Sequence, residues 1–195
     1  MVICITNRAL CPNDFLKQLA LIAEGKPDAV ILREKELDNT EYFHLAEQCM
    51  KILEPFSVPL SIHARPEIAR AIGASHVHLP FLQLQPQKDL QVSCSVHSVE
   101  EARLAEQHGA NYLIAGHIFE TDCKKDIPPR GTTFLRDVCQ SVSIPVYAIG
   151  GISSNNAALV RECGATGGCM MSALMRAQHP EQIIQTYRDS WEYQF

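Results

Sequence analysis

Two short segments in the last quarter of the chain have the composition of a phosphate-binding site. Gly150 and Gly151 follow an apolar run that ends at Ile149, and Met171 and Ser172 end a second run that leads into a helical pattern. Glycine lets the backbone approach an anion closely, and the N–H groups at a helix start attract phosphate. We therefore predict that Gly150, Gly151, Met171 and Ser172 bind phosphate. A plain tight turn is the alternative for the glycine pair.

A histidine follows another apolar run. His117 lies in the segment GHIFETDCKK at 116–125, which also contains Thr121 and Lys124. Histidine is the side chain best suited to proton transfer near neutral pH, and hydroxyl and ammonium groups can donate hydrogen bonds to a bound anion. We interpret His117 as the catalytic group and Thr121 and Lys124 as substrate-binding residues. On this pattern alone, a histidine that only forms hydrogen bonds is the commoner case.

Charged and polar residues end two further runs. Arg33 and Lys35 lie in the segment REKE at 33–36, and Ser95 ends a run near the middle of the chain. Arginine can hold a carboxylate or a phosphate in a forked contact. We predict that Arg33, Lys35 and Ser95 bind substrate. A solvated charge run, or an ion pair between Arg33 and Glu34, is the alternative.

The histidines and cysteines do not form a metal or disulfide pattern. His63, His76, His78 and His97 lie near the ends of apolar runs, but no carboxylate accompanies them. The eight cysteines include no CxxC or CxxH pair, and most lie inside apolar patterns that favour buried, reduced thiols. Cys123 has no identifiable partner that would make it a nucleophile. We predict no metal, no cofactor and no disulfide.

The elements that position these residues alternate along the chain. Strand patterns occur at residues 2–6, 29–32, 59–62, 76–78, 92–95, 112–115, 146–149 and 168–171. Helix patterns lie between them, at residues 15–24, 40–53, 99–108, 154–163 and 180–191. This alternation predicts an α/β fold, a single (β/α)8 TIM-barrel domain over residues 1–195, shortened at 80–90, where no helix fits. Catalytic groups of such barrels follow the carboxyl ends of the strands, where all the residues above are expected.

Composition excludes several classes of function. The 195 residues carry a net charge of −5, so there is no basic surface for nucleic acid, and 46% are hydrophobic, as in globular proteins. No apolar run is long enough to span a membrane. In residues 1–10, polar residues occur before an apolar segment long enough for a signal peptide can form. We therefore expect a cytoplasmic protein. The oligomeric state is left open, and a homo-oligomer is compatible with the sequence.

Six motifs occur in order along the chain: Arg33-Glu34-Lys35, Val77-His78-Leu79, Ser95-Val96-His97-Ser98, Gly116-His117-Ile118-Phe119-Glu120-Thr121, Ala148-Ile149-Gly150-Gly151-Ile152 and Met171-Ser172-Ala173-Leu174. Together they resemble the thiamine phosphate synthase/TenI superfamily over essentially the whole chain. The resemblance implies a compact TIM barrel that binds a phosphorylated thiazole.

The synthase branch of this superfamily joins a pyrimidine diphosphate to thiazole phosphate with magnesium. Its Gln-x-Arg-x-Lys pattern, which grips the diphosphate, corresponds here to Ile31, Arg33 and Lys35. Its Asn-Asp pair, of which the aspartate helps to bind magnesium, corresponds to the segment His-Ala at 63–64. A second acid is missing from the segment HLPFLQ at 78–83. Because magnesium prefers carboxylate ligands, these departures speak against the synthase reaction.

The other branch is similar to the thiazole tautomerase TenI, whose Gly-His-x-Phe-Glu-Thr-Asp-Cys-Lys-Lys signature matches residues 116–125. This resemblance implies a cofactor-free isomerase in which His117 moves a proton on a carboxythiazole phosphate, so that the exocyclic double bond gives way to an aromatic ring. Arg33 or Lys124 would then meet the substrate carboxylate. A synthase-like transferase and a non-catalytic regulator that binds a metabolite are the alternatives.

Overall fold

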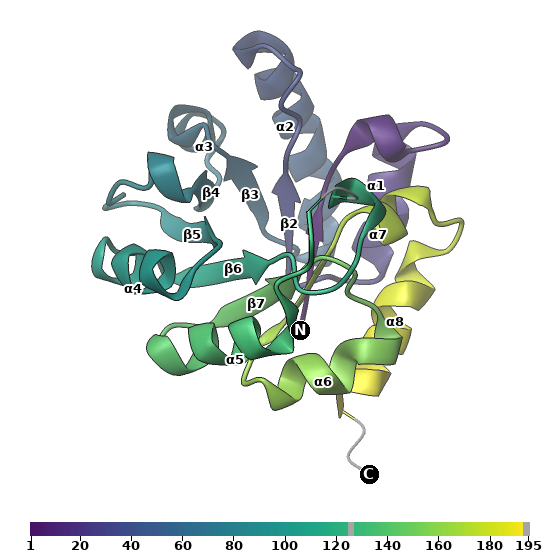
Figure 1. Cartoon of the computed structure of the whole chain (residues 1–195). Coiled ribbons are helices and arrows are strands. Elements are labelled where there is room, and N and C mark those ends of the chain that lie inside the picture. The colour runs from purple at the N-terminus through teal and green to yellow at the C-terminus, as the bar shows by residue number, and fades with distance from the viewer. Residues whose placement is uncertain (125–126, 193–195) are drawn as a thin grey trace.

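Eight parallel strands form one closed barrel in the computed structural model, which describes residues 1–124 and 127–192. The strands are β1 (Val2–Ile5), β2 (Ala29–Leu32), β3 (Leu60–His63), β4 (His76–Pro80), β5 (Gln91–Val96), β6 (Tyr112–Gly116), β7 (Val146–Ile149) and β8 (Gly167–Met170). Each strand pairs with the next along the chain, and β8 pairs with β1 (Figure 1). The predicted (β/α)8 barrel is therefore confirmed.

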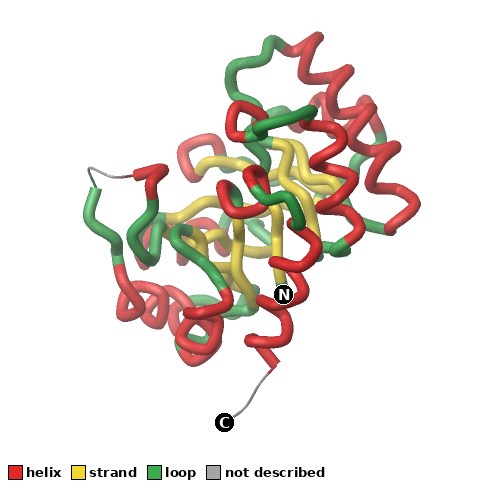
Figure 2. Tube along the Cα trace, turned by 90° about the vertical axis from the view of Figure 1, so that its right-hand side faces the viewer, coloured by secondary structure: helices red, strands yellow, loops and turns green. Residues whose placement is uncertain are grey.

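Helices surround the strands, as the red and yellow segments of Figure 2 show. They are α1 (Phe15–Glu24), α2 (Asn39–Leu53), α3 (Pro66–Ile72), α4 (Val99–Gln107), α5 (Gly131–Ser141), α6 (Ala157–Glu162), α7 (Ser172–Arg176) and α8 (Pro180–Glu192). Between β4 and β5 there is a 3-10 turn at Phe81–Gln83 instead of an α-helix, which confirms the predicted shortening. In the described part of the chain, no helix has the length and apolar character to cross a membrane.

Alternate residues of each strand face the inside of the barrel. One apolar cluster fills part of the interior and consists of Ile3, Ile5, Ala29, Ile31, Ile114, Tyr147 and Cys169. The residues between them pack outward against the helices in a larger core. By the same period of two, the interior positions of β3 to β5 include four buried polar residues: Ser61, His63, His78 and Ser93. The interior is therefore apolar on one side and polar on the other.

The backbones at the start of β1 and β8 are in close contact at the amino-terminal end of the barrel. The amide of Gly168 donates a hydrogen bond of 3.0 Å to the carbonyl of Met1. A Cβ on Gly167 would lie 2.3 Å from that carbonyl oxygen, so only glycine allows this approach. The seam, by which we mean the pairing of β1 with β8, therefore depends on close contact between the two backbones.

All eight cysteines are free, as predicted. Cys4, Cys94 and Cys169 are buried in or against the barrel wall, and burial raises the pKa of each thiol. These cysteines are therefore protonated core residues at neutral pH.

Candidate functional site

The carboxyl ends of β1 and β2 meet at a buried carboxylate. Glu34 is 1% exposed, and it accepts a hydrogen bond from the Thr6 hydroxyl and another, 3.0 Å long, from the amide of Arg8. Burial raises the pKa of Glu34. The Thr6 hydroxyl in turn accepts a 3.0 Å bond from the amide of Arg33. Glu34 thus orders the loop, and the ion pair with Arg33 that the sequence left open is not formed.

Two cations of this loop carry no counter-ion. The Arg8 guanidinium pairs with Glu36 at 2.7 Å. By contrast, the half-buried side chain of Arg33 and the exposed side chain of Lys35 form no ion pair or hydrogen bond with any residue that the structure describes. The charge of Arg33 lowers the pKa of Lys35, so the two cations lie within electrostatic range of each other. That Arg33 and Lys35 bind substrate stays a prediction.

Two buried histidines lie next to these cations. His63 of β3 and His78 of β4 are partners in the sheet register, and their ring centroids are 5.7 Å apart. The ring of His78 is held on both sides, because Nδ1 and Nε2 form 2.8 Å hydrogen bonds with the hydroxyls of Ser93 and Ser95. The predicted substrate-binding residue Ser95 is therefore joined to His78.

Burial keeps this histidine pair uncharged. It lowers the pKa of His63 to about 4 and that of His78 to about 3, and the charge of Arg33 adds to both effects. The ring of His63 bonds its own backbone, which opposes the fall in its pKa, and forms no hydrogen bond with another described residue. Sequence reasoning considered both histidines only as metal ligands and did not pair them. The alternation of the strands, which places both inside the barrel, was the available signal.

Helix α2 holds β2 and β3 together below this cluster. Its first turn is fixed by a capping box, in which the Asp38 carboxylate and the Glu41 carboxylate each accept a backbone amide. The next residue, Tyr42, is fully buried. Its hydroxyl donates to the carbonyl of Leu32 and accepts a 3.1 Å bond from the amide of His63. Tyr42 was missed by sequence reasoning because it fits an ordinary apolar helix face.

The loop between β6 and α5 contains the predicted catalytic histidine. His117 is 4% exposed, and its Nε2 lies 3.1 Å from the carbonyl oxygen of Ile127 in the same loop. The amides of Ile118 and Phe119 donate to the carbonyls of Ile149 and Gly150, at 2.8 and 3.0 Å. We expected His117 to face the open barrel mouth. Instead its ring is enclosed by its own loop, which is bonded to the end of β7.

The two glycines after β7 are needed for this contact between loops. Gly150 has φ +97°, and a Cβ there would lie 2.3 Å from the Cβ of His117. A Cβ on Gly151 would lie 2.5 Å from the carbonyl oxygen of Glu120 and 2.8 Å from the Cβ of Phe119. Close packing against the β6–α5 loop is sufficient to explain both glycines, and their contact with phosphate stays a prediction.

The remaining predicted residues lie around the same loops. Met171 is half-buried against the interior apolar cluster, and Ser172 begins the five-residue helix α7. Thr121 is half-buried, and its hydroxyl accepts the amide of Cys123 at 3.4 Å. Lys124 is exposed in the same turn, and Lys125 of the motif lies outside the described residues. The amide of Lys124 donates a 3.0 Å hydrogen bond to the carbonyl of Thr121, and no hydrogen bond or ion pair among the described residues joins either of them to a predicted site residue outside this turn.

The residues at the mouth do not fit magnesium, which the resemblance associates with the synthase branch. The loop carboxylates Glu34 and Glu36 are already bonded to Thr6 and Arg8. Across residues 1–124 and 127–192, no group of three or more histidine, cysteine, aspartate or glutamate side chains could hold a metal ion. The side chains of Arg33, Lys35 and His63 offer nitrogen atoms, whereas magnesium prefers oxygen ligands, usually carboxylates.

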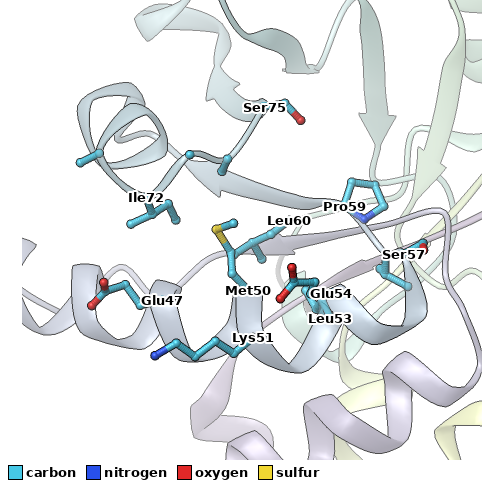
Figure 3. A pocket seen from close by; sticks show the side chains of 14 residues that line it. Glu47, Met50, Lys51, Leu53, Glu54, Ser57, Pro59, Leu60, Ile72 and Ser75 are labelled. Carbon is cyan, nitrogen blue, oxygen red and sulfur yellow. The ribbon is translucent and has the colours of Figure 1, made fainter.

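A cavity of about 710 Å³ lies at the other end of the barrel. It is bounded by the last turns of α2 and α3 and the start of β3, with Met50, Leu60, Ile72 and Ser75 among its lining residues (Figure 3). None of the predicted site residues lines it. Because active sites of such barrels lie at the carboxyl ends of the strands, we place the candidate site at the mouth.

Comparison with known proteins agrees with this barrel. The family profile described as "Thiamine monophosphate synthase" matches residues 2–174. A thiamine-phosphate synthase from Syntrophomonas wolfei subsp. wolfei is 35% identical over 197 residues, which covers 96% of this chain and 94% of that protein. The corresponding protein of Clostridium acetobutylicum is 36% identical over 182 residues, covering 89% and 86%. A solved structure of thiamine phosphate pyrophosphorylase from Pyrococcus furiosus has a TM-score of 0.86 at 29% identity, covering 98% and 95%.

These relatives correct the function expected from the sequence. The tautomerase interpretation depended on the loop motif at 116–125 and on the acids that are missing at 63–64 and 78–83. The proteins that match nearly the whole chain are nevertheless named thiamine-phosphate synthases. The prediction of an isomerase is therefore wrong. The contact between Nε2 of His117 and the carbonyl oxygen of Ile127 gives this histidine a structural role in its loop. Agreement over the full length, in sequence and in barrel architecture, shows that this chain belongs to the thiamine monophosphate synthase family.

Proposed function

We propose that this chain is a transferase of the thiamine-phosphate synthase class, which joins a pyrimidine diphosphate to a thiazole phosphate and releases pyrophosphate. The observation that carries the proposal is a pair of regions suited to anions at the same barrel mouth, separated by β1. One follows β2 and contains the unpaired cations Arg33 and Lys35. The other follows β7 and β8. Two phosphorylated substrates require two such regions, and the names of the full-length relatives support the same reaction.

We assign the diphosphate to the β2 side and the thiazole phosphate to the β7–β8 side. Arg33 and Lys35 supply charge for the diphosphate, and Ser95 acts indirectly by holding His78. Gly150 and Gly151 offer backbone amides for the thiazole phosphate. Met171 and Ser172 contribute the start of α7.

The β6–α5 loop closes the site between these regions. Thr121 and Lys124 belong to its turn and provide donors for bound anions. In this assignment His117 is a positioning residue, since its ring fixes the path of the loop through Ile127. Proton transfer by His117 belongs to the tautomerase reaction and is no part of this proposal.

The test is a coupling assay with the purified full-length protein, the pyrimidine diphosphate and the thiazole phosphate, in excess magnesium and separately in EDTA. Chromatography measures the joined product, and a phosphate assay coupled to pyrophosphatase measures the released pyrophosphate. We expect both products in equal amounts. A folded wild-type protein that forms neither product in either buffer would overturn the proposal.

Two variants separate the two assigned regions. Arg33→Gln should raise the KM for the pyrimidine diphosphate about tenfold or more, because a charge-assisted contact is lost. Ser172→Ala should raise mainly the KM for the thiazole phosphate. Arg8→Gln is the matched control, because the Arg8 side chain is exposed and pairs with Glu36. Equal effects of Arg33→Gln on both substrates would contradict the assignment of sides.

A further inference from the structure

The neutral histidine pair offers a hydrogen-bond donor at the place where the synthase branch uses metal-bound oxygen. His78 cannot take part directly, because both of its ring nitrogens are bonded to serine hydroxyls at 2.8 Å. His63 is different, because its backbone amide is fixed by Tyr42 while its ring bonds its own backbone and no other described residue. An imidazole carries at least one N–H in either protonation state. His63 therefore presents a donor whose backbone is held in place.

Two positive charges lie within electrostatic range of this donor. Arg33 and His63 directly follow Leu32 and Ile62, which are partners in the register of β2 and β3, and the charges of Arg33 and Lys35 both lower the pKa of His63. Arg65 contributes as well, but its guanidinium is already used, since it bonds Asn39 at 3.0 Å and lies over the ring of Tyr42. Arg33 and Lys35 have no such partners in the described structure. Like charges held close together are unfavourable, and an anion bound between them would relieve this repulsion.

The acidic positions of the synthase branch are replaced by residues without carboxylates. The Asn-Asp pair corresponds to His63 and Ala64, and the segment 78–83 contains no acid. Glu34, the buried carboxylate of this side, is occupied by Thr6 and Arg8. The free groups here can bind oxyanion oxygens but cannot coordinate a hard cation.

We propose that Arg33, Lys35 and His63 form a subsite that binds the diphosphate of a substrate directly, without a bridging divalent cation. The identity of the anion rests on the proposed function. The direct mode of binding rests on the residues at the mouth. His78 is a positioning residue for this subsite, because its ring, fixed by Ser93 and Ser95, lies beside that of His63.

The experiment is isothermal titration calorimetry of the full-length protein with inorganic pyrophosphate, in EDTA and in excess magnesium chloride, with inorganic phosphate as a second ligand. We expect pyrophosphate to bind in EDTA at least as tightly as in magnesium, and more tightly than phosphate. His63→Asn and Arg33→Gln should each weaken binding about tenfold to a hundredfold, because the first replaces the imidazole by a shorter side chain and the second removes a positive charge. Arg8→Gln should change the Kd by less than about twofold.

A gain-of-function variant keeps the test independent of damage to the fold. Ala64 has φ +57°, a conformation that aspartate tolerates better than most residues. Ala64→Asp restores a carboxylate at the family's acidic position. It should weaken pyrophosphate binding in EDTA by repulsion and make binding depend on magnesium. Circular dichroism of each variant checks that the barrel is retained.

The outcomes distinguish this subsite from the proposed function. Pyrophosphate binding by the wild type in magnesium only, or binding in EDTA that His63→Asn and Arg33→Gln leave unchanged, would overturn the subsite. If pyrophosphate binds in EDTA as expected but no coupled product forms in either buffer, the transferase proposal fails and the subsite stands. If the coupled product forms only in magnesium and pyrophosphate does not bind in EDTA, the transferase proposal stands and the subsite proposal fails.

Discussion

On the β3–β5 side of the mouth, polar side chains reach into the barrel from strand positions, whereas on the β6–β8 side the backbone of two loops is in close contact. His63 and His78 are examples of the first arrangement, and each is positioned by the strand that carries it. Gly150 and Gly151 are examples of the second, where the missing side chains permit the contact. The first side should therefore respond to changes of hydrogen bonding and charge. The second should respond to the addition of a single carbon atom.

The largest effect is expected from adding that carbon at Gly150. Gly150→Ala places a Cβ 2.3 Å from the Cβ of His117, so one of the two loops must move. We expect a loss of about 3–5 kcal/mol in the free energy of unfolding, measured by urea denaturation.

Gly109→Ala is the matched control for this variant. Gly109 also has a positive φ, +86°, but a Cβ there meets nothing within 4 Å. Only the backbone strain remains, and the cost should be about 1 kcal/mol. Equal losses of unfolding free energy for the two variants would show that close contact between the loops does not explain the effect of Gly150→Ala.

Acid should destabilise the protein through the β3–β5 side. The pKa of His63 is lowered to about 4 and that of His78 to about 3, from an ordinary value of 6.5. As the pH falls below 6.5, the unfolded chain binds protons that the folded chain does not, so stability is present above this pH and is lost below it. Urea denaturation at pH about 7.5 and about 4.5 should show a histidine-dependent loss on the order of 3 kcal/mol.

The double variant His63→Gln/His78→Gln measures this histidine contribution. Its unfolding free energy should depend less on pH than that of the wild type by the stated amount. The raised pKa of Glu34 acts in the opposite direction, but it is present in both proteins and largely cancels in the difference. Equal pH dependence in the two proteins would mean that the buried pair is not held neutral.

A smaller loss is expected from the hydroxyl that supports this side from below. Tyr42→Phe leaves the carbonyl of Leu32 and the amide of His63 without their side-chain partner, and should cost about 2 kcal/mol in unfolding free energy. The control is Tyr147→Phe, whose hydroxyl has only a 3.8 Å contact with the sulfur of Met1, and whose cost should stay below about 1 kcal/mol. If the two substitutions cost the same, the bridge between β2 and β3 is not a stabilising feature.

The smallest effect concerns His117 and is kinetic. His117→Ala removes the contact with Ile127 and should lower kcat/KM for the coupling reaction about tenfold, with little change in overall stability. His117→Gln offers an amide donor to the same carbonyl and should recover part of the activity. Recovery is not expected if the imidazole itself transfers a proton. An unrecovered loss would therefore favour direct chemistry by His117.

The barrel could be predicted because its strands are short, apolar and regularly spaced. The helices were harder where local signals are weak. Helices α3 and α5 were missed because neither Arg65 nor Arg130, which precede them, forms a side-chain cap, and α5 opens with glycine and two threonines. Tertiary packing against the strands stabilises these two helices, whose local sequences contain only weak helix signals.

The candidate site was predicted residue by residue, but its connections were not. Arg33, Lys35 and the glycine pair were found because charge and glycine at strand ends are visible in a sequence. That the ring of His63 lies beside that of His78 follows from the register of β3 and β4, which a single sequence does not reveal. The bond from His117 to Ile127 depends on how its loop folds back. The motif at 116–125 therefore identified an important loop but led to a wrong prediction of its chemistry.

The seam between β1 and β8 also constrains how the chain can fold during synthesis. β1 is made first, and its second partner is the last strand of the barrel, whose Gly168 amide bonds Met1. One edge of β1 must therefore stay without its final neighbour while the other seven strands emerge from the ribosome. Such an open edge can pair with other chains. The protein depends on a step that joins the most distant strands of the barrel, and that step can occur only after β8 has emerged from the ribosome.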